Sequence, residues 1–398
     1  MVTNEAGQIG VLGAGAMGSG IAQVAATAGC SVTVVDSSVI AVEKGRQSIH
    51  TNLARDVEKG RLGADAAREI ERRTRFVVSD GKGGRDLGAF ADCRLVIEAI
   101  VEDLSIKQSA FRAIEASVRE ECILATNTSS LSVAAIASAC KHPGRVIGLH
   151  FFNPAPVLPL VEVVHAITSD PAVVERGRAY VDRWGKVTVL ARDTPGFIVN
   201  RIARPFYGEA LRIYDEGIAD FATIDWAMKE LGGFKMGPFE LMDLIGNDVN
   251  YAVTSSVFEA MGYDPRYRPS ITQRRMVEAG RLGRKAGIGY YDYRNGADRP
   301  APATDRAAGA EVFNRVLAML INEAADALLF HVASPTDIDL AMTKGVNYPK
   351  GLLAWGDELG PATVHDRLVA LQDRYSEDRY RPSAVLKQAA REGRRLSK

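Results

Sequence analysis

Short runs of Val, Ile and Leu alternate with longer amphipathic stretches in the N-terminal half of the chain. Runs of this length and composition are typical of strands buried in a parallel sheet. The amphipathic stretches predict helices at 18–28, 39–59 and 104–119. Strands that alternate with helices indicate βαβ units, so the sequence predicts an α/β domain with a doubly wound parallel sheet. The predicted strands are 8–13, 31–36, 75–79, 94–99, 122–126, 145–150, 161–166 and 186–191.

The pattern changes at Asp193-Thr194-Pro195-Gly196, after which it is typical of helices. Residues 294–306 are rich in Pro, Ala, Gly and Asp, a composition that favours a linker. We therefore expect an α/β domain over 1–193, an all-α module over 194–293, a linker over 294–312 and a second all-α module over 313–398.

The two helical modules share a repeat. Residues 200–246 align without gaps on residues 314–360, at a constant offset of 114 and with 12 identities in 47 positions. The segment Arg-Tyr-Arg-Pro-Ser then recurs at 266–270 and 379–383, at an offset of 113. Self-similarity at a fixed offset indicates a duplicated structural unit, so we interpret 313–398 as a degenerate second copy of 194–293.

Charge and composition exclude several classes of protein. The 398-residue chain has 49 basic and 49 acidic side chains, so it lacks the electrostatic footprint of proteins that bind nucleic acid or anionic membranes. No stretch reaches the ~20 apolar residues that a membrane span requires. The residues before the first predicted strand are mostly polar, so no signal peptide is expected there.

The cysteines favour neither a disulfide framework nor a metal site. Cys30, Cys93, Cys122 and Cys140 are widely spaced, and none belongs to a CxxC pair. We therefore expect no bound metal, and a reducing compartment, the cytoplasm.

Gly13-Ala14-Gly15-Ala16-Met17-Gly18 is a G-x-G-x-x-G segment that ends a hydrophobic run and begins a predicted helix. In a Rossmann-type domain the first glycine permits a tight turn, the second lets the backbone approach a pyrophosphate, and the third allows close packing of helix on strand. Asp36 ends the next predicted strand, where a carboxylate accepts hydrogen bonds from the adenosine ribose and repels a 2′-phosphate. The segment predicts an NAD site. The alternatives are a glycine turn without a ligand and a surface acid at Asp36.

His150 stands at the end of another predicted strand, and Glu162 lies in the strand that follows. The carboxyl ends of strands in α/β sheets present ligand-binding residues. A carboxylate beside an imidazole fixes its tautomer and raises its basicity, as a general base requires. The alternative is a core histidine and an unrelated acid.

Six segments between residues 13 and 293 together resemble L-3-hydroxyacyl-CoA dehydrogenases of the bacterial 3-hydroxybutyryl-CoA and 3-hydroxyadipyl-CoA type. The second helical module resembles one found in the longer members of this family. The segments are GAGAMGSGIAQ at 13–23, VIEAIVEDLSIK at 96–107, NTSSL at 127–131, GLHFFNPAPVLPLVEVV at 148–164, DTPGFIVNR at 193–201 and GRKAGIGYYDY at 283–293.

The resemblance implies a catalytic role for four residues. His150 matches the family's catalytic base and Glu162 its acidic partner. Ser129 matches the serine that hydrogen-bonds the 3-oxygen of the substrate, and Asn200 matches the asparagine near the histidine. Two of these assignments have structural alternatives: Ser129 could cap the helix expected after Leu131, and Asn200 could be purely structural because the repeat retains Asn-Arg at 314–315.

The resemblance also implies binding residues. Glu102 and Lys107 match residues that line the nicotinamide half of the cofactor site, and Lys285 matches a lysine that contacts the cofactor. Asn52 and Lys59 fall where the family's helical hairpin contacts coenzyme A. A lysine facing solvent is the alternative for Lys107. The basic residues of the hairpin form either a cationic patch for the CoA phosphates or a solvated helix face; they are Lys44, Arg46, Arg55, Lys59 and Arg61.

The reaction implied by the resemblance is the NAD-dependent oxidation of an (S)-3-hydroxyacyl-CoA to the 3-oxoacyl-CoA, in fatty-acid or aromatic-acid catabolism. One alternative is a dehydrogenase of a small free hydroxy acid, and another is a non-catalytic NAD-binding protein like the family's lens crystallins. Shorter relatives pair through their helical module as homodimers, so we expect the two modules of this chain to form an internal pseudo-dimer. The sequence leaves open whether whole chains are monomers or homodimers.

Overall fold

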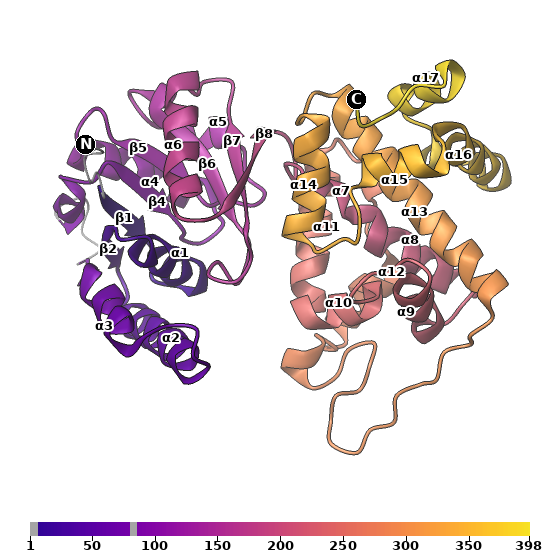
Figure 1. Ribbon diagram of the computed structural model, residues 1–398, viewed down its shortest axis with the longest axis horizontal. Coiled ribbons are helices and arrows are strands. Elements are labelled where there is room, and N and C mark those ends of the chain that lie inside the picture. The colour runs from indigo at the N-terminus through magenta and orange to yellow at the C-terminus, as the bar shows by residue number, and fades with distance from the viewer. Residues whose placement is uncertain (1–6, 80–85) are drawn as a thin grey trace. The chain divides into compact units, whose positions relative to one another are not determined.

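A computed structural model describes residues 7–79 and 86–398 of the chain. The chain divides into two compact units, Met1–Thr194 and Pro195–Lys398 (Figure 1). The N-terminal segment in which no signal peptide is expected lies, for residues 1–6, outside the described residues. None of the helices in the described part of the chain combines the length and the apolar character needed to cross a membrane.

The first unit contains one eight-stranded sheet with the strand order β3-β2-β1-β4-β5-β6-β7-β8. Each of the predicted strands is present, with each bound shifted by no more than one residue. The central strands are apolar throughout; Ile9, Ile97 and Ile147, for example, are fully buried. The strands are β1 Gln8–Leu12, β2 Ser31–Asp36, β3 Thr74–Val78, β4 Leu95–Glu98, β5 Ile123–Thr126, β6 Val146–Phe151, β7 Leu160–His165 and β8 Val187–Arg192.

The sheet is parallel, as most of the apolar runs indicated, except at one strand pair. β6 and β7 run antiparallel, whereas the other strand pairs are parallel. Only the short segment 152–159 joins these two strands. A parallel connection needs a crossover of a dozen or more residues, so this segment can only reverse the chain.

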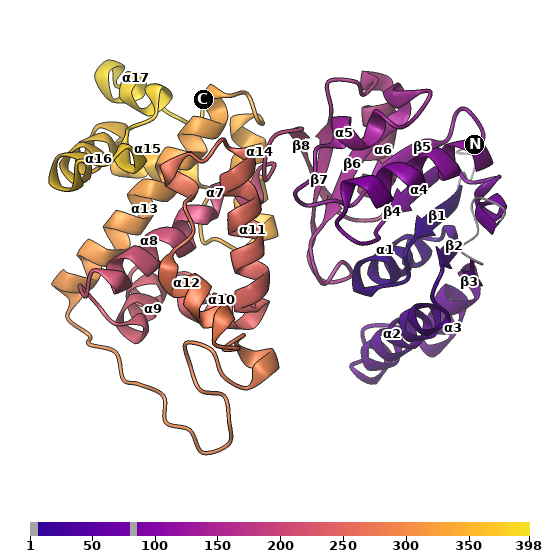
Figure 2. The same cartoon turned by 180° about the vertical axis from the view of Figure 1, so that it is seen from behind.

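Helices cover both faces of the sheet, with α6 in front in Figure 1 and α4 in front in the reverse view of Figure 2. α2 begins after Ser38, whose hydroxyl accepts a hydrogen bond from the Ala41 N–H at 3.2 Å. Together with α3 it forms a helical hairpin next to β3. The helices of this unit are α1 Ala16–Thr27, α2 Val39–Glu58, α3 Ala64–Arg73, α4 Leu104–Ser117, α5 Val133–Ala137 and α6 Pro171–Arg183, with 3₁₀ turns η1 Asp86–Phe90 and η2 Pro143–Arg145.

The second unit is helical, and its helices follow the sequence repeat. The first module contains α7 Val199–Ile202, α8 Arg204–Asp215, α9 Phe221–Glu230, α10 Pro238–Ile245, α11 Asn247–Ala260, η3 Pro265–Tyr267, α12 Ile271–Glu278 and η4 Arg284–Ala286. The second contains α13 Arg306–Leu329, α14 Pro335–Gly345, α15 Leu352–Leu359, α16 Pro361–Tyr375, η5 Asp378–Tyr380 and α17 Ala384–Glu392. With the offset of 114, α10 maps onto α15 at both ends, and with 113, η3 maps onto η5.

The segment expected to be a linker is only partly without helix. Residues 294–305 form neither helix nor strand, and α13 begins at Arg306. Asp305 caps this helix, because its carboxylate accepts a hydrogen bond from the Ala307 N–H at 2.8 Å. Residues 306–312 of the expected linker therefore belong to a helix.

The two modules of the second unit contact each other through paired buried charges. Arg201 of α7 donates to Glu323 of α13 at 2.6 Å, and Arg315 of α13 donates to Glu209 of α8 at 2.6 Å. In the repeat, Arg201 corresponds to Arg315 and Glu209 to Glu323. Each ion pair therefore has its counterpart with the roles of the modules exchanged, as in a two-fold symmetric interface.

Candidate active site

The glycine-rich turn lies between β1 and α1, and its three glycines are required for different reasons. Gly13 has φ +107°, and a Cβ there would lie 2.4 Å from the Ala99 carbonyl oxygen. A Cβ on Gly18 would lie 1.9 Å from the Gly13 oxygen, so the third glycine permits the close packing of α1. A Cβ on Gly15 would meet no protein atom within 4 Å. Protein packing therefore does not demand glycine at Gly15, whereas the approach of a ligand does.

Asp36 joins this turn to the end of β2. Its Oδ2 accepts a hydrogen bond from the Ala14 N–H at 2.7 Å, and its Oδ1 accepts one from the Ser38 N–H at 2.8 Å. α1 begins at Ala16 after Gly15, whose lack of a side chain leaves the first N–H groups of the helix uncapped. The N-terminus of α1 suits the pyrophosphate of a dinucleotide, and the carboxylate of Asp36 suits its ribose. Gly13, Gly15, Gly18 and Asp36 therefore fit NAD.

His150 and Glu162 stand directly opposite each other on the antiparallel strands β6 and β7. The His150 Nδ1 lies 2.6 Å from the Glu162 Oε2, and the two residues are 6% and 0% exposed. A buried carboxylate on Nδ1 accepts its proton and leaves Nε2 as the basic nitrogen of the neutral ring. The antiparallel pairing that the sequence did not predict thus creates this pair.

A buried lysine at the start of α4 contacts a buried carboxylate at the end of β4 and an exposed one just before α4. The Lys107 Nζ is 2.5 Å from the Glu98 Oε1 and 3.2 Å from the Glu102 Oε2. Because Lys107 is 1% exposed, the alternative of a solvent-facing lysine is wrong. Burial raises the pKa of Glu102, but the charge of Lys107 and hydrogen bonds from Thr128 and Ser130 outweigh it and hold that pKa below its usual value.

Ser129 follows the end of β5, and its backbone N–H donates to the Glu102 Oε1 at 3.1 Å. The helix after Leu131 is capped by Ser132, whose hydroxyl accepts from the Ala135 N–H at 3.2 Å. The alternative that Ser129 caps this helix is therefore wrong. The structure brings Glu102, Lys107 and Ser129 together.

Sequence reasoning missed two residues that organise this region. Glu98, fully buried, accepts from Lys107 and from the Thr126 hydroxyl at 2.7 Å. The Asn127 side-chain oxygen accepts from the Phe151 N–H at 2.9 Å and so fixes the residue after His150. Both stand at the carboxyl end of an apolar strand, and this position was the available signal.

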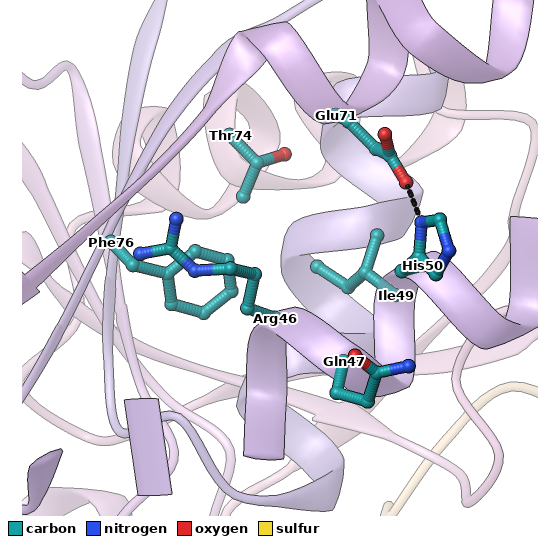
Figure 3. A pocket seen from close by; sticks show the side chains of 7 residues that line it. All are labelled: Arg46, Gln47, Ile49, His50, Glu71, Thr74 and Phe76. Atoms are coloured by element: carbon teal, nitrogen blue, oxygen red, sulfur yellow. Dashed lines mark hydrogen bonds and ion pairs between the residues drawn. The ribbon is translucent and has the colours of Figure 1, made fainter. Parts of the chain in front are cut away.

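The residues matched to coenzyme A lie on α2. The Asn52 Nδ2 donates to the Gln23 Oε1 of α1 at 3.2 Å, so this asparagine links two helices of the unit. Lys59 caps the C-terminus of α2 and its side chain is exposed. A pocket of about 370 Å³ lies between α2, α3 and β3, where Arg46 stacks on Phe76 and His50 lies 2.7 Å from Glu71 (Figure 3). The pocket includes one residue of the expected cationic patch, Arg46, but neither Asn52 nor Lys59.

Asn200 and Lys285 belong to the second unit. Asn200 lies in α7, and its backbone oxygen accepts from the Arg204 Nε at 2.8 Å. The Lys285 Nζ lies 2.6 Å from the Asp248 Oδ1, and the lysine is about half exposed. Burial raises the pKa of Asp248, but hydrogen bonding to Lys285 outweighs burial and lowers it below its usual value.

The first unit is a Rossmann-type domain that has a glycine-rich turn and an acid at the end of β2. It also holds a buried imidazole–carboxylate pair. This combination is typical of a dehydrogenase that uses a nicotinamide dinucleotide. The family model of the 3-hydroxyacyl-CoA dehydrogenase NAD-binding domain matches residues 8–194. That of the 3-hydroxyacyl-CoA dehydrogenase C-terminal domain matches twice, at residues 196–293 and 312–398.

Several known proteins are similar over most of the chain. A 3-hydroxyadipyl-CoA dehydrogenase of Escherichia coli K12 is 38% identical, over 96% of this chain and 97% of its own. A 3-hydroxybutyryl-CoA dehydrogenase of Bradyrhizobium diazoefficiens is 40% identical, over 74% and 97%. The crystal structure of a 3-hydroxybutyryl-CoA dehydrogenase from Escherichia coli K12 superimposes with a TM-score of 0.89 at 37% identity, over 96% and 98%. The chain belongs to the 3-hydroxyacyl-CoA dehydrogenase family, whose members are oxidoreductases that use NAD.

The geometry of Asp36 predicts a strong preference for NAD over NADP. A carboxylate at the end of β2 repels a 2′-phosphate, and the next residues, Ser37 and Ser38, supply no positive charge. Asp36→Ala should narrow the difference in kcat/KM between the two dinucleotides. It should do so mainly by weakening the binding of NAD, because the Ala14 N–H also loses its acceptor. Measurement of kcat/KM with each dinucleotide checks this, with Ser37→Ala as the control. Equal kcat/KM for the two dinucleotides in the unchanged protein would contradict the prediction.

Proposed function

We propose that the chain oxidises an (S)-3-hydroxyacyl-CoA to the 3-oxoacyl-CoA, with His150 as the general base. The observation that carries this proposal is the buried pair of the His150 Nδ1 and the Glu162 Oε2, 2.6 Å apart. With Glu162 on Nδ1, Nε2 takes the proton of the substrate 3-hydroxyl. Glu162 then stabilises the imidazolium, as a carboxylate does beside a catalytic histidine.

When bound, NAD accepts the hydride that leaves C3 of the substrate. Gly15 and the N-terminus of α1 would hold its pyrophosphate, Asp36 its adenosine ribose, and Glu102 and Lys107 would line its nicotinamide half, with Lys285 as a further contact. We propose that Ser129 and Asn200 hydrogen-bond the substrate oxygen while it becomes a carbonyl. Such hydrogen bonds align the reacting atoms and stabilise the developing charge. Asn52, Lys59 and the basic residues of α2 remain our proposal for contacts with coenzyme A.

The domain organisation that we propose has one active site per chain. Residues 1–193 bind NAD, residues 194–293 complete the site, and 313–398 form an internal pseudo-dimer with 194–293. The exchanged ion pairs Arg201–Glu323 and Arg315–Glu209 support this proposal. We propose that the second module is a packing partner of the first.

The substrate is tested with a panel of CoA thioesters. We expect NADH oxidation with acetoacetyl-CoA and none with free acetoacetate, because the resemblance places the chain in the CoA-dependent branch. Relatives of this chain are named for a four-carbon and for a dicarboxylic substrate. Thioesters of varied chain length and terminal charge therefore separate 3-hydroxybutyryl-, 3-hydroxyadipyl- and longer substrates. Turnover of the free acid alone would overturn the proposal in favour of a hydroxy-acid dehydrogenase, and no turnover at all would favour a non-catalytic NAD-binding protein.

The proposal of a cytoplasmic protein rests on the cysteines. All four are free and buried, as is usual where thiols stay reduced. Burial raises the pKa of Cys93 and of Cys122 to about 12, so these thiols are poor nucleophiles and have no part in the proposed reaction.

A further inference from the structure

The side chain of Arg201 connects α7 to a carboxylate of the other helical module. Its Nε donates to the Glu323 Oε1 at 2.6 Å, and the two side chains are only 2% and 1% exposed. The Tyr267 hydroxyl donates to the same oxygen at 2.5 Å. Burial lowers the pKa of Arg201, but the charge of Glu323 outweighs burial and raises it above its usual value, so the guanidinium is charged. Arg201 thus depends on Glu323 for its counter-charge.

Arg201 is the immediate neighbour of Asn200, and both lie in a helix of a single turn, Val199–Ile202. Backbone hydrogen bonds from Ile202 to Ile198 and from Ala203 to Val199 close this turn, Ala203 alone joins it to α8, and Ile198 before it has an apolar side chain that cannot cap it. Contacts fix the backbone on both sides of Asn200. Arg204 holds the Asn200 carbonyl oxygen at 2.8 Å, and the neighbouring Arg201 is bound to Glu323. These two arginines therefore hold the backbone at Asn200, from which its side-chain amide extends.

The corresponding pair in the repeat has a different setting. Arg315 donates to Glu209 at 2.6 Å and also lies 2.9 Å from Glu216. Arg315 and its neighbour Asn314 lie inside α13, a helix of 24 residues whose own hydrogen bonds hold the backbone. Loss of Glu209 therefore leaves Arg315 a second carboxylate and leaves the backbone of α13 in place. We therefore expect the loss of the carboxylate partner to disturb the local backbone at Arg201 in α7 but not at Arg315 in α13.

We propose that Glu323 is a positioning residue for the reaction, which holds Arg201 and thereby fixes the amide of Asn200. The inference rests on the proposed function, in which Asn200 binds the substrate oxygen. The degenerate second module then contributes to the chemistry of the first, in addition to covering its surface. Glu323 acts through Arg201 and touches no reacting atom.

Glu323→Gln in the full chain tests this inference, because the amide keeps the shape of the side chain and removes its charge. We expect kcat with acetoacetyl-CoA and NADH to fall on the order of ten- to a hundredfold, as expected when a binding group is displaced by a fraction of an ångström. The Kd of NADH should stay unchanged, because the predicted cofactor residues Gly15 and Asp36 lie in the other unit and Lys285 is paired with Asp248 rather than with Glu323. Glu209→Gln is the matched control and should lower the melting temperature while leaving kcat within about twofold.

A double-mutant cycle with Asn200→Ala separates positioning from general destabilisation. If Glu323 acts through Asn200, Glu323→Gln lowers kcat in the unchanged chain and causes no further loss in the Asn200→Ala chain. If Glu323→Gln does not yield folded protein, Glu323→Asp, which keeps the charge and shortens the reach, goes through the same cycle. The inference is overturned if Glu323→Gln lowers kcat by the same factor in the unchanged chain and in the Asn200→Ala chain. It is also overturned if Glu323→Gln leaves kcat of the unchanged chain as it was.

The cycle also distinguishes the inference from the function on which it rests. If Asn200→Ala lowers kcat and Glu323→Gln does not, the role of Glu323 fails and that of Asn200 stands. If Asn200→Ala leaves kcat unchanged, the proposed role of Asn200 fails and the inference fails with it.

Discussion

His150→Gln should lower kcat by about two to four orders of magnitude, the usual contribution of a general base. The amide is similar in polarity to the imidazole but cannot accept the proton of the substrate hydroxyl at neutral pH. Binding of NADH should stay intact, because Gly15 and Asp36 follow β1 and β2, whereas His150 lies on β6, and β4 and β5 stand between β1 and β6 in the sheet. Steady-state kinetics with acetoacetyl-CoA, together with fluorescence titration of NADH, measure the two effects separately.

Glu162→Gln gives the matched comparison for this experiment. The amide can still face the His150 Nδ1 from 2.6 Å away, but it cannot stabilise the imidazolium as a carboxylate does. The loss in kcat should therefore be smaller than that of His150→Gln. His150→Gln together with Glu162→Gln should be no slower than His150→Gln alone, because residues that act as a unit are not additive. Near-normal turnover of the His150 variant would show that the base is another group.

The strands of the first unit could be predicted from the sequence because their apolar runs are short and clearly bounded. Their directions could not, since direction depends on the connection. The run that ends at His150 and the run that contains Glu162 are indistinguishable in pattern from parallel strands, and only the short segment 152–159 reverses the chain. The predicted pairing of His150 with Glu162 rested on their positions in consecutive strands and on the resemblance, whereas the physical reason for it is the antiparallel register.

The polar network around Lys107 marks a second limit of the sequence. An acidic residue that ends an apolar strand, such as Glu98, has the same pattern whether it faces solvent or a buried lysine. The repeat likewise identified Arg201, Glu209 and their counterparts as shared residues, but a repeat alone does not show that each arginine pairs across the modules. Such pairs depend on how helices pack in three dimensions, which the one-dimensional pattern does not contain.

Deletion of residues 307–398 should yield aggregates or new dimers. The deletion removes the partners of Glu209 and Arg201 and uncovers both side chains. It also exposes aromatic side chains of the first module: the Phe206 and Phe234 rings lie 5.7 and 5.0 Å from that of Tyr348. Size-exclusion chromatography with light scattering measures the outcome, since the full chain keeps both modules together at a high effective concentration.

The exchanged ion pairs also predict how truncated chains would associate. Because Glu209 is the repeat counterpart of Glu323, the Glu209 of one truncated chain can take the place of Glu323 beside the Arg201 of another. The new dimer should then have two equivalent Arg201–Glu209 pairs. Glu209→Lys in the truncated chain places like charges opposite each other, so it should abolish the dimer, whereas Lys229→Ala, which changes a lysine paired within its own module, should not. A truncated chain that is soluble, monomeric and fully active would rule out the pseudo-dimer as a requirement of the fold.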